Sequence, residues 1–99
     1  MSAVRFENNN DNVYQIIGEL NMATVPQLLN DMSGLFKTGN DSVVIDLSEV
    51  SRSDSAGLAL LLEWLAQAKH NNTSITFQNL PEQMQAIIKV SGLEALISA

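Results

Sequence analysis

The 99-residue chain contains no cysteine, so it forms no disulfide and offers no thiolate to a zinc ion. Aromatic residues make up only 5% of the sequence, although hydrophobic residues together make up 45%. The core is therefore expected to consist mainly of aliphatic side chains. A chain of this length buries one core, and we expect a single domain over residues 1–99.

Basic residues are few as well. The chain has 5 Lys and Arg against 11 Asp and Glu, which gives a formal net charge of −6. The basic positions are scattered along the chain, at Arg5, Lys37, Arg52, Lys69 and Lys89. Binding to nucleic acid or to anionic lipid needs clustered Lys and Arg. We therefore expect neither ligand, and we expect another protein as the partner.

Long apolar runs are also missing. The longest, Leu58–Leu62, has five residues, whereas a membrane span needs roughly 18. The N-terminal sequence MSAVRFE has no apolar segment of signal-peptide length. The sequence thus predicts a soluble, cytoplasmic protein without direct membrane insertion. It shows no motif for a cofactor or a metal ion.

The pattern of apolar residues predicts seven elements. We expect strands over Val4–Glu7, Val13–Leu20, Ser42–Leu47 and Thr73–Phe77, and helices that begin at Thr24, Ser55 and Pro81 and end near Leu35, His70 and Gly92. Gly39–Asp41 breaks the chain before the third strand. The order β-β-α-β-α-β-α predicts an α/β fold with a mixed four-stranded sheet, because two β-α-β connections join parallel strands.

Three details of this fold follow from local composition. Asn8–Asn12 is a turn cluster, so the first two strands should form an antiparallel hairpin. Ser42–Leu47 is almost entirely apolar, which predicts a central strand covered on both faces. The apolar residues after Gly92 are expected to form a short turn that closes the core; they are Leu93, Leu96 and Ile97.

The segment SDSAG, Ser53–Gly57, resembles a loop that carries a nucleophilic serine. The nucleophile elbow is Gly-x-Ser-x-Gly, but Ser53 occupies the first glycine position. The serine also needs a base, and the one histidine, His70, follows Ser55 by 15 residues on the same predicted helix. At about 1.5 Å per residue, the two are roughly 22 Å apart. We therefore expect that Ser55 is not a catalytic nucleophile and that the protein is not an enzyme.

A structural role is the second interpretation of this segment. Ser53, Asp54 or Ser55 can cap the following helix, and Gly57 can provide close packing in its first turn. This interpretation explains the polar residues, but it leaves the apolar pattern of the helix unexplained.

The predicted helix Ser55–His70 carries apolar residues on two sides. One stripe is expected to be buried and contains Leu58, Leu61, Leu62, Leu65 and Ala68. Leu60 and Trp64 point away from this stripe, beside Ala56 and Gly57. Either the third helix or the chain end covers this second side, or it is exposed to a partner. We favour exposure, because Trp is enriched at interface hot spots.

Two segments, GELNMATVPQL and VVIDLSEVSRSDSAGLALLL, make the chain resemble a STAS domain. This is the fold of sulfate-transporter cytoplasmic domains and of anti-sigma-factor antagonists. In the sigma-regulating members, the residue after the motif aspartate accepts a phosphoryl group, and Ser55 holds that position here. Ala56 stands where the family has Ser or Gly, and Asn21 stands where those regulators commonly carry Asp.

The helix segment GLALLLEWLAQAK is similar to the MlaB-type STAS subunit of the Mla system, a bacterial ABC-type phospholipid transporter that maintains outer-membrane asymmetry. The resemblance implies a non-enzymatic cytoplasmic subunit that binds and supports the transporter ATPase. The alternative is an anti-sigma-factor antagonist, switched by phosphorylation at Ser55, whose partner is an anti-sigma factor kinase. The expected partner-binding residues are Asp54, Ser55, Ala56, Gly57, Leu60 and Trp64.

Acidic residues surround the expected docking point. Asp46, Glu49 and Asp54 are expected to provide negative potential that selects a basic patch on the partner. Arg52 is expected to pair locally with one of these carboxylates. Alternatively, the three carboxylates are solvated loop residues without a role in binding.

Overall fold

A computed structural model describes residues 4–10, 12–36 and 41–97 of the chain. The elements follow the predicted order, β-β-α-β-α-β-α. They are β1 Val4–Asn10, β2 Val13–Leu20, α1 Val25–Asp31, β3 Ser42–Ser53, α2 Ser55–His70, β4 Ser74–Gln78 and α3 Glu82–Ser91. The predicted break at Gly39–Asp41 lies largely outside the described residues, which include only Asp41 of the three.

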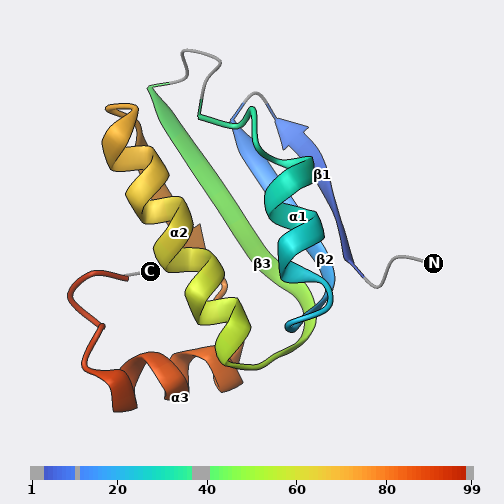
Figure 1. Ribbon diagram of the computed structural model, residues 1–99, viewed down its shortest axis with the longest axis vertical. Coiled ribbons are helices and arrows are strands. Elements are labelled where there is room, and N and C mark those ends of the chain that lie inside the picture. The colour runs from blue at the N-terminus through green and yellow to red at the C-terminus, as the bar shows by residue number, and fades with distance from the viewer. Residues whose placement is uncertain (1–3, 11, 37–40, 98–99) are drawn as a thin grey trace.

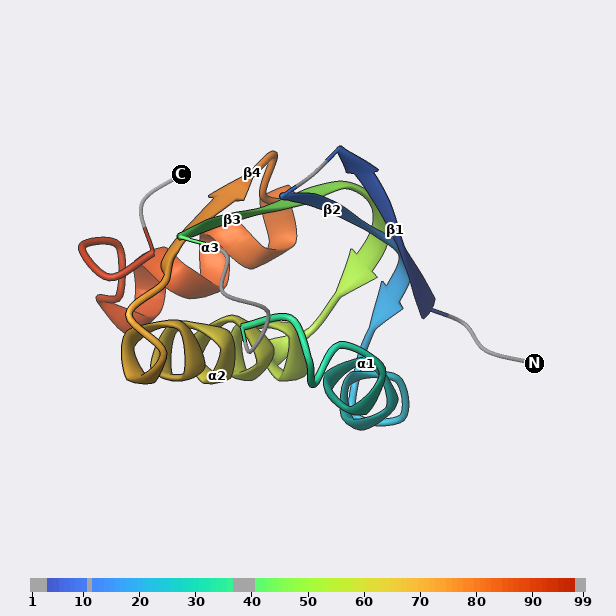
Figure 2. The same cartoon turned by 90° about the horizontal axis from the view of Figure 1, so that it is seen from above.

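The four strands form one mixed sheet in the order β1-β2-β3-β4. β1 and β2 are antiparallel, and β3 is parallel to both β2 and β4. The predicted α/β fold with its mixed sheet is confirmed. Figure 1 shows α1 and α2 lying in front of the sheet, and Figure 2 shows the three helices on the same side of it.

The prediction that the third strand is covered on both faces is wrong. Alternate residues Val43, Ile45 and Leu47 are fully buried under the helices, whereas Val44 and Asp46 on the opposite face are partly exposed. The strand is also longer than predicted. It continues past Leu47 because β2 pairs with it as far as Ser53, through two register shifts.

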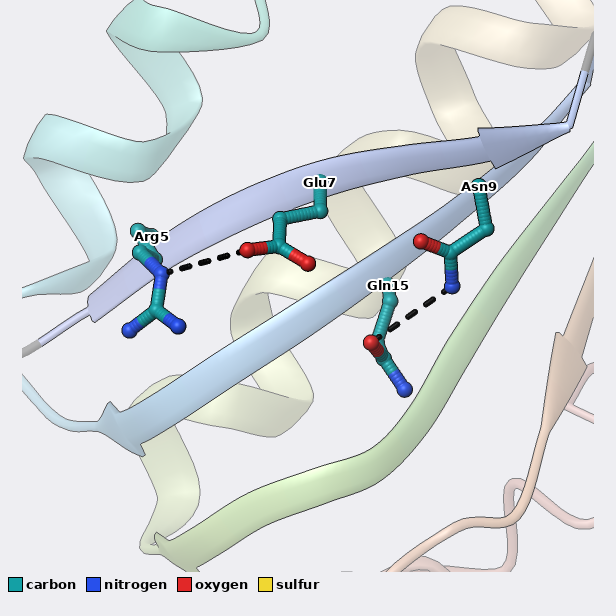
Figure 3. A network of polar contacts seen from close by, with 4 residues as sticks. All are labelled: Arg5, Glu7, Asn9 and Gln15. Carbon is teal, nitrogen blue, oxygen red and sulfur yellow. Dashed lines mark hydrogen bonds and ion pairs between the residues drawn. The ribbon is translucent and has the colours of Figure 1, made fainter.

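The open face of the sheet carries several polar side chains on β1 and β2. Figure 3 shows Arg5, Glu7, Asn9 and Gln15 on this face of β1 and β2. The Nε atom of Arg5 lies 3.6 Å from Glu7 Oε2, and Asn9 Nδ2 donates to Gln15 Oε1 at 3.5 Å. Polar and buried residues alternate along these strands because helices cover one face of the sheet and solvent contacts the other.

Several element ends differ from the prediction: α1 ends at Asp31 instead of near Leu35, and β4 is Ser74–Gln78 instead of Thr73–Phe77. β1 continues to Asn10, which pairs with Val13 after a register shift, so the predicted turn Asn8–Asn12 is shorter; its Asp11 lies outside the described residues. Of the predicted closing turn, Ile97 is buried, but Leu96 remains 62% exposed.

The prediction that Leu60 and Trp64 lie on an exposed face is wrong, because both side chains are fully buried. Helix α2 lies on the sheet with α1 on one side and α3 on the other, as Figure 2 shows. Its buried residues form a single broad face, and they are Gly57, Leu58, Leu60, Leu61, Trp64 and Ala68. At about 100° per residue, Leu58 and Leu60 are the two edges of this face, about 160° apart, rather than two separate faces.

Candidate functional site

The three polar residues that could cap α2, Ser53, Asp54 and Ser55, have different environments at the start of the helix. Asp54 is the N-cap, since its Oδ1 accepts a hydrogen bond from the Ala56 backbone N–H at 2.8 Å. Ser53 is buried, and its hydroxyl donates to the Asp54 carbonyl at 3.2 Å. Ser55 is exposed, and its hydroxyl has no hydrogen-bond partner within the described parts of the chain. The hydroxyl of Ser55 is therefore available to an outside group.

Helix α3 supports this turn from the inner side. The Ser53 backbone N–H donates to Gln83 Oε1 at 3.1 Å. A Cβ atom on Gly57 would lie 2.9 Å from Met84 Cε and closer still to Ser53 Oγ. A Cβ at position 57 would therefore force the Ser53 or Met84 side chain to shift, which agrees with the close-packing role predicted for Gly57. Gly57 is buried and Ala56 is half-buried, so Ser55 is the most accessible residue of this turn after the cap.

The exposed face of α2 begins at Ser55. Ala59 and Ala66 are exposed and Leu62 is half-buried, at spacings of 4, 11 and 7 residues from Ser55. These spacings place all four residues on one side of the helix. This face differs from the prediction, in which Leu62 belongs to the buried stripe. The spacings of 4, 7 and 11 residues from Ser55 are visible in the sequence and could have indicated this face.

A cleft of about 280 Å³ lies beside this turn, between the ends of β2 and β3. The Asp54 backbone N–H donates to the Leu20 carbonyl at 3.1 Å, which joins the two strand ends. Two carboxylates, Glu19 and Asp54, and one cation, Arg52, line the cleft, which we call the acidic cleft. Since β2 and β3 are parallel, their ends meet at one edge, and the two motif segments become neighbours.

The other predicted acidic residues lie away from the cleft. Asp46 is in the middle of the sheet, opposite Gln15 on β2 and Gln78 on β4. Burial alone would raise the pKa of Asp46, but hydrogen bonds from the Asn79 side chain and from the backbone and hydroxyl of Ser48 hold it below its usual value.

Two further expectations for the acidic residues need correction. Glu49 and Arg52 lie on the strand rather than in a loop. No ion pair involving Arg52 is present within residues 4–10, 12–36 and 41–97.

The one histidine of the sequence, His70, does not lie near Ser55. His70 ends α2, at the opposite end from Ser55, so no histidine base lies beside that hydroxyl. The described residues contain no group of three or more side chains suited to a metal ion. None of the described helices combines the length and the apolar character that crossing a lipid bilayer requires.

The fold and this site define a small α/β domain whose accessible chemistry is an exposed serine at a helix start, next to an acidic cleft. The chain belongs to the STAS domain family, because the family model described as "Mlab, STAS domain" matches residues 4–98.

A curated relative supports the same assignment. The chain is 30% identical over 91 residues to an anti-sigma-B factor antagonist of Bacillus subtilis strain 168, covering 92% of this chain and 83% of the relative.

Among solved structures, an anti-sigma factor antagonist from Mycobacterium paratuberculosis matches with a TM-score of 0.75 and 24% identity, covering 99% of this chain and 88% of that one. The phosphorylated form of the Bacillus cell fate determinant SpoIIAA matches with a TM-score of 0.71 and 21% identity, over 96% and 88%. These two matches support the fold.

Proposed function

We propose that the protein is a non-enzymatic, cytoplasmic regulatory subunit that docks on a partner protein through the N-terminal turn of α2. The observation that carries the proposal is the exposed Ser55 hydroxyl, which remains free because Asp54 caps the helix. Ala59, Leu62 and Ala66 extend the same face with small or apolar side chains that a partner can cover. The relatives' names describe regulation of another protein and no catalysed reaction.

Ser55 also suits a phosphorylation switch. A phosphoryl group at a helix start is favoured by the helix dipole and by free backbone N–H groups, so the fold tolerates it. A partner that covers Ser55 would have to desolvate this charge beside Asp54, which is costly. Phosphorylation would therefore release the partner without unfolding the domain. The solved phosphorylated and unphosphorylated forms of SpoIIAA support a switch of this kind.

The first candidate partner is an anti-sigma factor kinase. Its support is the name of the relatives, anti-sigma-B factor antagonist, which match 81–92% of this chain. In this role the unmodified protein binds the kinase, and transfer of the ATP γ-phosphoryl group to Ser55 Oγ ends the complex.

The second candidate partner is the ATPase subunit of an ABC-type phospholipid transporter that maintains outer-membrane lipid asymmetry. Its support is the family description, "Mlab, STAS domain", together with the resemblance of GLALLLEWLAQAK in α2 to the STAS subunit of the Mla system. Ala56 and Asn21, which differ from the residues that sigma regulators carry at these positions, are compatible with this role. In it, the domain would support assembly or activity of the ATPase.

Calorimetric titration against both candidate partners from the same organism tests the proposal. We expect one of them to bind with a Kd of about 1 µM or tighter. Mass spectrometry after incubation with ATP then distinguishes them, because only the kinase should convert Ser55 to phosphoserine, and Ser55→Ala should abolish the modification. Failure of both proteins to bind would refute the proposed docking function.

A further inference from the structure

Met22 lies in the loop that joins β2 to α1, and its side chain is 83% exposed. Among the described residues, two other large hydrophobic side chains are similarly exposed, Val90 and Leu96. Both of those lie at the end of α3 or in the turn after it. Single exposed hydrophobic residues are common, so the exposure of Met22 alone assigns no role.

The loop around Met22 is held by a set of short hydrogen bonds. Asn21 Oδ1 accepts from the backbone N–H groups of Ala23 at 2.9 Å and Thr24 at 3.1 Å. The Thr24 hydroxyl accepts from the Asn21 N–H at 3.0 Å and donates to the Glu19 carbonyl at 2.8 Å. A partner that buries Met22 therefore does not have to order this loop first, which lowers the entropic cost of binding.

The same loop lies next to the first turn of α2. The hydrogen bond from the Asp54 N–H to the Leu20 carbonyl ties the helix start to a point two residues before Met22. Asn21, which directly precedes Met22, lines the acidic cleft together with Asp54, which directly precedes Ser55. The loop from β2 to α1, which carries Met22, and the first turn of α2, which begins with Ser55, therefore both lie next to the acidic cleft. Figure 1 shows this loop and the start of α2 at the same end of the sheet.

We infer that Met22 is an apolar anchor of the docking surface and enters a hydrophobic pocket on the partner, whose rim carries Lys or Arg opposite the acidic cleft. The inference rests on the proposed docking function and adds to it a residue that determines specificity. A flexible thioether side chain adapts to a pocket on another protein. The net charge of −6 and the two carboxylates against one cation in the cleft match a basic partner surface.

Titration of Met22→Ala against the anti-sigma factor kinase and the transporter ATPase, used as probes, tests the inference. We expect Met22→Ala to weaken the complex at least tenfold at unchanged melting temperature. The matched control is Val90→Ala, which removes an equally exposed hydrophobic side chain on α3 and should change the affinity less than twofold. Raising the salt concentration should weaken the wild-type complex, because a basic rim is screened.

The outcomes separate this inference from the proposed function. Unchanged affinity of Met22→Ala, together with loss of binding by Ser55→Asp, would overturn the anchor and leave the docking function intact. Equal losses for Met22→Ala and Val90→Ala would also overturn the anchor, because they would show no preference for the cleft. Binding of neither probe to the wild-type protein would overturn both.

Discussion

At the scale of residues, three neighbours at the start of α2 have three different environments. Ser53 is buried and its backbone N–H donates to Gln83, Asp54 caps the helix, and Ser55 is exposed. The motif predicted that one of them would be the cap, and the backbone decides which. Asp54 has the extended conformation of an N-cap residue, with φ −106° and ψ −164°. The capping role and the proposed docking role thus belong to adjacent residues, Asp54 and Ser55.

Replacement of Gly57 tests the close contact between α2 and α3. Gly57→Ala places a methyl group against Ser53 Oγ and Met84 Cε, so we expect a loss of about 1–3 kcal/mol in the free energy of unfolding. Gly34→Ala is the control, because beyond its two chain neighbours no atom lies within 4 Å of the added Cβ there. Urea denaturation measures both variants. Equal stability of the two would show that the first turn of α2 is not tightly packed.

Asp46 predicts a pH dependence of stability. Its pKa is lower in the folded protein than the ordinary value of 3.8, so the charged carboxylate stabilises the fold above that pH. This contribution is lost as the pH falls below 3.8 and through the folded pKa. Asp46→Asn keeps an acceptor for Asn79 and removes the charge. We therefore expect the stability advantage of wild type over Asp46→Asn, measured by urea denaturation, to be constant near neutral pH and to shrink below pH 3.8; a constant difference throughout would contradict this.

At the scale of elements, the order and type of all seven helices and strands were predictable from the sequence, because apolar periodicity and turn residues mark each one. The ends of strands that depend on pairing with a neighbouring strand were not predictable. β3 continues to Ser53 because β2 pairs with it, although its later residues are polar. The orientation of α2 also escaped prediction. An apolar helix with Leu at 58, 60, 61, 62 and 65 has several possible buried directions, and packing against α1 and α3 selects the one centred on Leu61 and Trp64.

Trp64 should therefore be essential to stability. We expect Trp64→Ala to lose about 3–5 kcal/mol and Leu60→Ala about 2–5 kcal/mol in the free energy of unfolding, as buried large-to-small substitutions do. Trp64→Phe should lose less, because the buried indole Nε1 has no hydrogen-bond partner in the described residues and no bond is broken. The exposed Glu63→Ala is the control and should change stability by about 0.5 kcal/mol or less. Wild-type stability in Trp64→Ala would restore the exposed-face interpretation.

At the scale of the whole molecule, one edge of the sheet gathers the functional features. The parallel strands β2 and β3 end there, and the first turns of α2 and α3 meet there. Binding sites of α/β sheets commonly form at the carboxyl ends of parallel strands. The sequence predicted Asp54 to Gly57 as a site, but it could not predict Glu19 or Met22 beside them, because their proximity depends on strand order and register. The helices cover one sheet face, and this edge, where the site residues gather, is the proposed docking surface.

The central claim is that a partner covers Ser55 and that charge there prevents docking. Titration of wild type, Ser55→Ala and Ser55→Asp against the partner that binds tests it most directly, with the melting temperature of each variant as the control for folding. We predict wild type to bind most tightly, Ser55→Ala to bind somewhat more weakly, and Ser55→Asp to lose at least tenfold in affinity while remaining folded, because the partner would bury an unpaired carboxylate. Equal affinity of Ser55→Asp and wild type would contradict the claim and place the docking surface elsewhere on the molecule.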